Sequence, residues 1–449
     1  MAYDPFSDPG VANARSEIRG WNRVPDHFAW AAEFDILCDM LTEETKAMTR
    51  TSELLGRAGK VLIGNYARQP IVMERGEGSW LWDSEGRKYL DLFAGFGGCI
   101  LGHCDRDLVA AVTEQAGRLW HVGNTFHTEP QIDVGERLNR HAFAGQAFFC
   151  HSGLEANEAA CKLARLHGNK ASPRKWKIVS LTRSFHGRSL AMIAATGNPA
   201  TRAGFEPDVP GFVVVEAGNF EALAAACDDE TAAVLLEPIQ GEGGVYPQCV
   251  DYVRKVRALC DERKMLLIWD EVWTGCGRTG KWFGYQHLNG EDGRPIEPDI
   301  MTLGKAVGGG LPVGIMFAKP EIAAELVPGK HGCTLGGNPI CMAACRTIFD
   351  AIENRGLLER AAQLGEKAMA ALRGASSIAG KIKEVRGQGL MIGIELAAVP
   401  EKPVDKGLAR GIIVNLTNQK VLRLAPALTI SDAQWDHGVA QVIELIAAL

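Results

Sequence analysis

The stretch Leu266-Leu267-Ile268-Trp269-Asp270-Glu271-Val272 constrains the fold most, because an apolar run ends abruptly in two carboxylates. A run of this kind predicts a buried parallel strand over 266–272. In open α/β sheets ligands bind at the carboxyl ends of the strands, so the two acids should emerge at a binding site. A second short strand is predicted from Asp299, and it is followed by a single lysine, Lys305, and by the glycine run 308–310.

One acid and one lysine presented from neighbouring strand ends suit pyridoxal phosphate (PLP). The lysine amine can form a Schiff base, and the acid can keep the pyridine nitrogen protonated so that the ring accepts electrons. A strand-end carboxylate that caps a helix, together with a surface lysine, is the simpler interpretation of either residue taken alone. The choice depends on the rest of the chain.

Strands alternate with helices over about 200 residues, which predicts a doubly wound, mostly parallel sheet. The expected strands are Ala147–Cys150, Lys177–Leu181, Phe212–Glu216, Ala232–Leu236 and, after Lys305, Val313–Ala318. The first of them enters a helix through Ser152-Gly153, where free backbone N–H groups and a hydroxyl make a candidate phosphate site. Gly275–Gly280 matches GxGxxG but does not follow its strand directly, so we interpret it as a loop.

Shorter elements flank this region. Strands are expected over 71–76, 79–83 and 89–93, and a helix over 107–119. Later come a loop over 331–339 that opens a long helix reaching about Asn354, a helix over 359–373, strands near 382–385 and 391–396, and a C-terminal helix. Before them lies an arm of mixed charge with a plausible amphipathic helix from Phe28 to Met40.

Composition excludes several classes of function. Apolar residues make up 46% and charged residues 23% of the 449, as in a globular enzyme. A net charge of −6 argues against nucleic acid as the main partner, and no apolar run approaches the ~20 residues of a membrane helix. The twelve cysteines show no CxxC pair, which favours reduced thiols in a cytoplasmic protein. His103 beside Cys104 lacks a second ligand pair, so we expect a structural histidine and no metal site.

Together these segments resemble a class III aminotransferase of the fold-type-I PLP enzymes, most similar to the acetylornithine aminotransferase group. The resemblance runs from about Val61 to the C-terminus. It rests on motifs in the family's order, namely Ser152-Gly153-Leu154-Glu155-Ala156-Asn157-Glu158, Phe185-His186-Gly187-Arg188, Glu237-Pro238-Ile239-Gln240-Gly241-Glu242-Gly243, Asp270-Glu271-Val272, Lys305, Thr334-Leu335-Gly336-Gly337-Asn338-Pro339 and Arg423-Leu424-Ala425-Pro426-Ala427-Leu428.

The resemblance implies an α/β chain with a large domain, whose sheet is doubly wound and mostly parallel, and a smaller α+β domain from the N-terminal and C-terminal segments. We expect an N-terminal arm over 1–50 and the first part of the small domain over 51–104. The large PLP-binding domain should occupy 105–330, and the rest of the small domain 331–449.

The family's cofactor residues carry over position by position. Lys305 resembles the Schiff-base lysine that also shuttles a proton, and Asp270 resembles the partner of the pyridinium nitrogen. By the same resemblance Val272 and Phe185 pack on the two ring faces, and Ser152, Gly153 and Leu154 form the phosphate cup. Thr334 resembles the threonine that reaches the phosphate from the neighbouring subunit, which implies a homodimer with shared active sites.

Two arginines resemble the substrate clamps, since a guanidinium grips a carboxylate bidentately. Arg188 corresponds to the arginine that holds the acetylornithine carboxylate, with Cys333 beside it. Arg423 corresponds to the second clamp. In the family, a glutamate residue that matches Glu242 pairs with this arginine and releases it when the substrate glutamate binds. For each arginine alone, a surface ion pair is the simpler interpretation.

Three positions depart from the family pattern. His151 stands where Asn is usual, Trp273 stands where this subgroup usually has a Gln that contacts the cofactor, and Cys333 replaces a usual serine. The indole N–H of Trp273 donates one hydrogen bond and accepts none. Its larger side chain is expected to narrow the pocket or to change the pKa of the Schiff base.

The resemblance implies transamination of N2-acetylornithine with 2-oxoglutarate, as in arginine biosynthesis, without nucleic-acid or membrane partners. The alternatives are another ω-amine donor (ornithine, 4-aminobutyrate, putrescine or succinyldiaminopimelate), a PLP aminomutase or decarboxylase, and a non-catalytic protein on the same fold.

Overall fold

The computed structural model describes residues 49–449, which fall into two compact units, one ending at Ala67 and the other running from Arg68 to Leu449. The expected arm and its helix at 28–40 lie outside the described residues. In the first unit, α2 (Arg50–Val61) begins at Thr49, whose side chain accepts a hydrogen bond from the backbone N–H of Ser52. No helix of the described part is both long enough and apolar enough to cross a bilayer.

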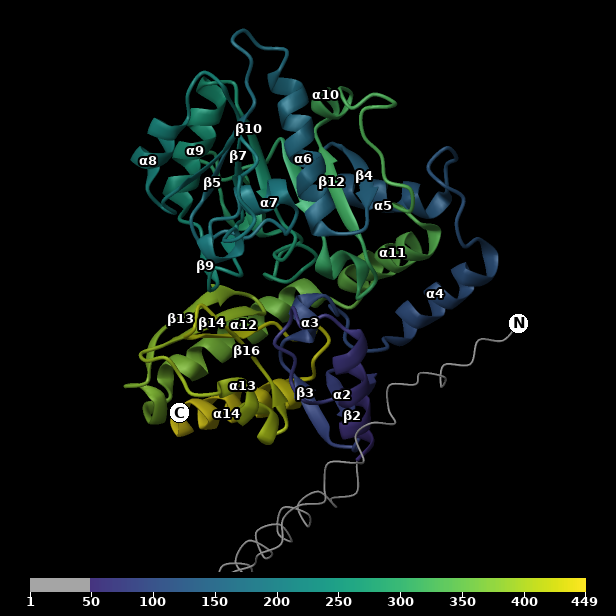
Figure 1. Ribbon diagram of the computed structural model, residues 1–449, viewed down its shortest axis with the longest axis vertical. Coiled ribbons are helices and arrows are strands. Elements are labelled where there is room, and N and C mark those ends of the chain that lie inside the picture. Colours follow the sequence, from purple (N-terminus) through teal and green to yellow (C-terminus); the bar gives the residue numbers. More distant parts are fainter. Residues whose placement is uncertain (1–48) are drawn as a thin grey trace, which may run out of the picture. The chain divides into compact units, whose positions relative to one another are not determined.

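A seven-stranded sheet organises the second unit (Figure 1). Its order is β4 (Gln146–Cys150), β12 (Gly314–Ala318), β11 (Ile300–Leu303), β10 (Leu266–Asp270), β7 (Thr231–Leu236), β5 (Lys177–Leu181) and β6 (Phe212–Val215). All neighbours from β11 to β6 are parallel, whereas β12 runs antiparallel to both β11 and β4. The doubly wound, mostly parallel sheet predicted from the sequence is therefore confirmed.

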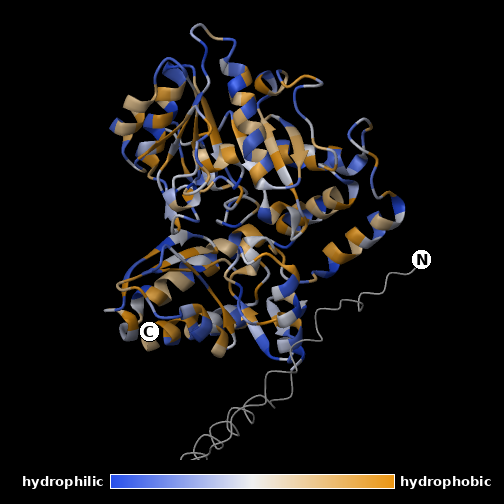
Figure 2. Cartoon of the chain, viewed as in Figure 1, coloured by the Kyte–Doolittle hydropathy of each residue, from blue (hydrophilic) through white to orange (hydrophobic). Residues whose placement is uncertain are grey.

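Helices cover both faces of this sheet, because its strands are apolar on both sides. Alternate residues of one strand join different cores: Leu266 and Ile268 of β10 pack with α6 (Gly153–Gly168), whereas Leu267 and Trp269 pack with α9 (Val250–Glu262). Figure 2 shows these strands largely in hydrophobic colours. The other elements of this layer are α4 (Arg106–Arg118), α5 (Glu129–His141), α7 (Leu190–Ala195), α8 (Phe220–Ala226), α10 (Pro320–Ala323), α11 (Pro339–Asn354), β8 (Ile239–Gln240) and β9 (Tyr246–Pro247).

Segments from both ends of the chain build a smaller α+β part. One sheet joins β1 (Met73–Glu77), β2 (Trp80–Asp83) and β3 (Lys88–Asp91) to β15 (Ile412–Ile413), which lies parallel to β3. The other has the order β13 (Ile382–Gln388), β14 (Met391–Leu396), β17 (Val421–Leu424) and β16 (Asn415–Thr417). The remaining helices are α3 (Ala94–Gly97), α12 (Leu357–Gly374), α13 (Pro403–Ala409) and α14 (Asp432–Ala448).

The predicted elements agree closely with the observed ones. The expected strand over 391–396 has the same limits as β14, and α11 ends at Asn354 as expected, although it begins at Pro339, the last residue of the loop predicted to open it. The strand that was expected to reach Val272 ends at Asp270, because the chain turns there. The GxGxxG match forms turns, as predicted. His103 pairs with Asp91 (Nε2 to Oδ2, 2.9 Å), which agrees with its structural interpretation.

Candidate functional site

Asp270 ends the central strand β10 and is held rigidly there. Its Oδ2 accepts hydrogen bonds from Asn157 Nδ2 (2.7 Å) and from His186 Nδ1 (2.8 Å). Its Oδ1 accepts one from the backbone N–H of Val272 (3.0 Å), and the residue is only 4% exposed. Donors that converge on both oxygens fix this carboxylate in one orientation, as a site that must present an anion requires.

Lys305 follows β11, the neighbour of β10, and begins a short 3-10 turn (Lys305–Gly308). Its φ of 42° lies in the left-handed region, which is uncommon for a residue with a side chain and is a frequent feature of functional sites. Its Nζ lies 4.4 Å from the ring centre of Trp273. Burial lowers the pKa of this amine, while the carboxylates of Glu242 and Asp270 oppose that effect. Burial therefore makes the neutral, nucleophilic amine easier to reach.

The N-terminus of α6 approaches the same place. Ser152 is its N-cap and accepts a hydrogen bond from the backbone N–H of Glu155 (3.2 Å). A Cβ on Gly153 would lie 2.6 Å from both methyl carbons of Val272, so only glycine allows the helix to approach the loop after β10 so closely. The first N–H groups of a helix have no partners within it, and here they face a cavity.

A cavity of about 520 Å³ collects most of the predicted site residues. The predicted residues that line it are Ser152, Gly153, Leu154, Phe185, Arg188, Glu242, Asp270, Val272, Trp273 and Lys305. Among the described residues, Arg423, Cys333 and Thr334 are the predicted ones that are absent from this lining.

Arg423 nevertheless belongs to the site through Glu242. Its Nη1 lies 3.0 Å from Glu242 Oε2 and also donates to the carbonyl of Gly241, and its Nε donates to Asn415 (2.8 Å). The arginine is 2% exposed, whereas the Glu242 side chain is 27% exposed toward the cavity. Glu242 is therefore the partner through which the buried guanidinium is connected to the cavity.

Trp273 fills the space between the lysine and this ion pair. Its ring lies 4.6 Å from the Arg423 guanidinium carbon and meets Phe93 edge to face. Gly241 makes room for the indole, since a Cβ there would lie 2.1 Å from it. The Trp273 Nε1 is buried and has no hydrogen-bond partner among the described residues. The indole thus narrows the cavity and leaves one donor free.

Two predicted residues lie elsewhere. Thr334 is exposed, and Cys333 contacts His151 (Sγ to Nδ1, 3.3 Å). Arg188 is exposed at the cavity wall, with its guanidinium carbon 5.6 Å from the centre of the Phe185 ring. The structure therefore brings Cys333 to His151, which was singled out in the sequence as a departure from the family pattern.

Three residues of the site had no role assigned from the sequence. Asn157 and His186 hold Asp270, and Glu237 lines the cavity while it accepts the N–H of Phe185 (3.2 Å). Burial, and then the charge of Asp270, raise the pKa of Glu237 well above its ordinary value. All three residues lie inside the motifs on which the family resemblance rests, and those motifs could have indicated that they belong to the site.

The residues present fit PLP. A lysine amine and a fixed carboxylate share one cavity, a valine and a phenylalanine provide apolar surfaces in it, and a helix N-terminus suits a phosphate. An anion beside a pyridine nitrogen stabilises its protonated form.

Comparisons with known proteins agree with this geometry. The family model for Aminotransferase class-III matches residues 63–446. The chain is 41% identical to an acetylornithine aminotransferase of Myxococcus xanthus, over 86% of this chain and 96% of that protein. It is 44% identical to one from Gloeobacter violaceus, over 86% and 96%. Among solved structures, the ornithine aminotransferase of Toxoplasma gondii ME49 superposes with a TM-score of 0.84 at 28% identity, covering 94% of this chain and 99% of that one.

Proposed function

The chain belongs to the class III aminotransferases, and on that basis we propose that it uses PLP to transfer the terminal amino group of N2-acetylornithine to 2-oxoglutarate. The products are N-acetylglutamate 5-semialdehyde and glutamate, as in arginine biosynthesis. The observation that carries the proposal is the Arg423–Glu242 ion pair, which lies at the cavity that Lys305 and Asp270 line.

That pair suits two different substrates in one pocket. With Glu242 on Arg423, the guanidinium is neutralised and the cavity accepts an uncharged or amine-bearing chain. With Glu242 turned away, Arg423 offers two parallel N–H donors to the second carboxylate of 2-oxoglutarate. Arg188 at the exposed wall holds the carboxylate of the acetylated donor.

The other residues act on orientation and proton transfer. PLP supplies the electron-accepting ring when it is bound. The Asp270 carboxylate holds a proton on the ring nitrogen, and Asn157 with His186 keeps that carboxylate in place. Lys305 Nζ moves the proton at the reacting carbon of the substrate. Ser152, Gly153 and Leu154 would hold the phosphate, and Val272 and Phe185 would provide apolar contacts to the ring.

We propose further that the protein works as a homodimer in which Thr334 of the partner subunit reaches the phosphate. In its own chain Thr334 is exposed and lies outside the cavity lining. The loop that carries it is bound by Asn124, whose Nδ2 donates to the carbonyls of Cys333 (2.9 Å) and Gly336 (2.8 Å). In the sequence around Asn124, Trp120 is 67% and Phe126 is 64% exposed, and large exposed aromatic side chains of this kind suit contact with a second subunit.

The test is glutamate formation by the purified, PLP-loaded protein with 2-oxoglutarate and one amino donor at a time. We expect the highest kcat/KM for N2-acetylornithine. Ornithine is the first competitor, because solved structures of ornithine aminotransferases share this fold; 4-aminobutyrate, putrescine and succinyldiaminopimelate complete the panel. A higher kcat/KM for any of these amines would identify it as the amino donor in place of N2-acetylornithine, and the proposed transamination would still stand. Turnover that does not require 2-oxoglutarate would point to an aminomutase or a decarboxylase.

A further inference from the structure

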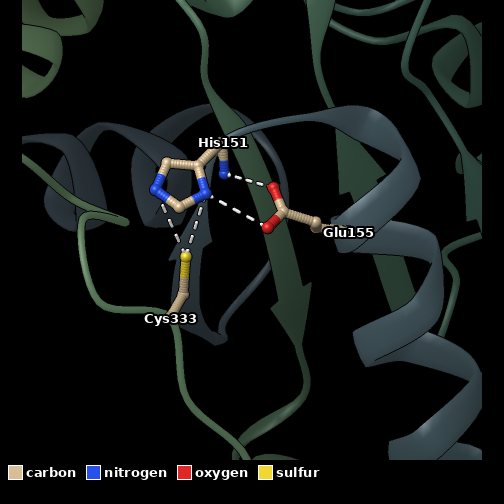
Figure 3. Close-up of side chains that lie close together, drawn as sticks. All are labelled: His151, Glu155 and Cys333. Atoms are coloured by element: carbon tan, nitrogen blue, oxygen red, sulfur yellow. Dashed lines mark hydrogen bonds and ion pairs between the residues drawn. The ribbon is translucent and has the colours of Figure 1, made fainter.

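Two side chains four residues apart, His151 and Glu155, and a third from a distant loop, Cys333, meet beside the cavity. His151 follows β4, Glu155 lies in the first turn of α6, and Cys333 lies in the loop before α11. Figure 3 shows the imidazole between the carboxylate and the thiol, with all three side chains turned toward one another. One nitrogen, one oxygen and one sulfur atom of these residues lie within 4.8 Å of one another.

Hydrogen bonds connect the three side chains, and the same atoms are donors that bind metals. His151 Nδ1 lies 3.1 Å from Glu155 Oε1 and 3.3 Å from Cys333 Sγ, and His151 Nε2 lies 3.6 Å from the same sulfur. An imidazole that donates its Nδ1–H to Glu155 can accept the Cys333 S–H only at the longer Nε2 distance. Ligand atoms bound 2.0–2.3 Å from a tetrahedral zinc ion stand roughly 3.2–3.7 Å apart, close to the separations seen here.

The carboxylate is already oriented for such a role. Glu155 Oε2 accepts the backbone N–H of His151 (2.8 Å) and the hydroxyl of Ser152 (3.2 Å), which leaves Oε1 directed at the cluster. Outer contacts of this kind fix the orientation of metal ligands. The side chains of His151 and Glu155 are 36% and 41% exposed, so an ion can enter and water can take a fourth position.

We propose that His151, Glu155 and Cys333 form a binding site for a divalent d-block cation, with Zn²⁺ as the preferred occupant. Nitrogen, sulfur and oxygen donors together suit Zn²⁺ or Co²⁺, whereas Mg²⁺ and Ca²⁺ prefer oxygen alone. A thiolate and a carboxylate balance the double positive charge. The site adjoins the proposed transamination residues, since His151 lines the cavity and Ser152 donates its hydroxyl hydrogen to Glu155.

The test is calorimetric titration of the PLP-loaded, full-length protein with ZnCl₂ after removal of metals by a chelator. We expect one Zn²⁺ per protomer and no binding of Mg²⁺. His151→Asn and Cys333→Ser restore the residues usual in the family, and each should weaken Zn²⁺ binding roughly tenfold or more. With Co²⁺ as the probe, the wild-type protein should give the intense visible bands of a tetrahedral site, and Cys333→Ser should lose their thiolate contribution.

Matched controls separate this site from incidental binding. Cys249→Ser removes an exposed thiol at the start of α9, and His127→Asn removes an exposed imidazole. Both should bind Zn²⁺ as the wild type does. The proposal is wrong if Cys333→Ser keeps wild-type affinity, or if a control loses as much affinity as the cluster variants. Cys333 lies in a loop, so its variant decides the matter even if His151→Asn does not fold.

Discussion

At the scale of single residues, the site depends on one carboxylate and one amine whose surroundings differ. Asp270 receives three hydrogen bonds, so its charge is held in place. Burial lowers the pKa of the Lys305 amine. Strand-end positions singled out both residues, and the family motifs along the rest of the chain decided their interpretation. Their partners were not predictable from spacing, because Asn157 and His186 lie 113 and 84 positions from Asp270.

Replacing Lys305 should remove catalysis and spare cofactor binding. In Lys305→Ala we expect turnover to fall by roughly 10⁴-fold, since both the nucleophile and the proton carrier are lost. PLP should still bind through the phosphate and ring contacts, which equilibrium dialysis measures. Lys255→Ala, an exposed lysine of α9, is the control and should keep wild-type turnover. Normal turnover in Lys305→Ala would end the proposed mechanism.

Neutralising Asp270 should slow the reaction without abolishing the fold. Asp270→Asn keeps the shape but brings an amide N–H against donors from Asn157 and His186, and it removes the anion beside the ring nitrogen. We expect kcat to fall roughly 10²- to 10³-fold, as for the loss of one preorganised electrostatic contact. Steady-state kinetics with saturating PLP measures this effect, and an unchanged kcat would exclude Asp270 as the charge that the ring needs.

At the scale of elements, the position of the site depends on tertiary packing and not on the periodicity of apolar residues in the sequence. The alternation of strands and helices predicted β10, α6 and α11 to within about two residues at each end, because apolar period and cap residues are local signals. The close approach of α6 to the loop after β10 is not local. It arises because Gly153 lies against Val272, which is 119 positions further along the chain.

The glycine at this contact should therefore be essential for cofactor binding. In Gly153→Ala the new methyl group would lie 2.6 Å from Val272, so the helix start must move away from the cavity. We expect at least about tenfold weaker PLP binding, since phosphate contacts depend on the position of those N–H groups. Gly135→Ala in α5 has nothing within 4 Å and should bind PLP normally, with stability equal or up to about 1 kcal/mol higher. Equal PLP affinities would contradict the role of this contact.

The small sheet contains a carboxylate whose contribution depends on pH. Glu395 of β14 is 3% exposed and accepts hydrogen bonds from Lys383 (3.0 Å), Arg386 (2.8 Å) and Tyr246 (3.1 Å). Burial raises the pKa of Glu395, but these partners together with Lys420 outweigh that effect and lower it to about 2. Because the folded pKa lies below the unfolded one, the stabilisation is complete above the unfolded value of about 4.3. It is lost as the pH falls from there toward about 2.

Glu395→Gln should consequently destabilise the protein most at neutral pH. We expect the free energy of unfolding to fall by about 3 kcal/mol at pH 7, and the gap to the wild type to narrow below about pH 4.3. Urea titrations of both proteins at several pH values measure the gap. A gap that stays constant down to pH 3 would show that the charge of Glu395 contributes nothing.

At the scale of the whole molecule, one chain does not supply every residue that the proposed mechanism uses. Lys305 and Asp270 line the cavity of their own chain, while Thr334 is exposed outside it. The sequence could assign Thr334 to a neighbouring subunit only through the family resemblance, because spacing cannot distinguish contacts within a chain from contacts between chains. Spacing is also silent on the His151–Glu155–Cys333 cluster, because only the tertiary fold brings Cys333 to the local pair His151 and Glu155.

Subunit mixing tests whether Thr334 acts on the partner. Thr334→Glu places a negative charge where the phosphate is held, so this variant should bind PLP poorly, and Lys305→Ala is inactive for the reason given above. In a heterodimer of the two variants, the cavity with an intact Lys305 receives its Thr334 from the Lys305→Ala subunit and is complete, whereas the other cavity lacks both. Co-expressed chains with different affinity tags, purified through both tags, should therefore regain up to half of the wild-type activity per dimer.

A heterodimer of Lys305→Ala and Asp270→Asn chains has no complete cavity and should stay at the level of its parents. If the first heterodimer is as inactive as Thr334→Glu alone, then Thr334 acts within its own chain and the shared site is wrong.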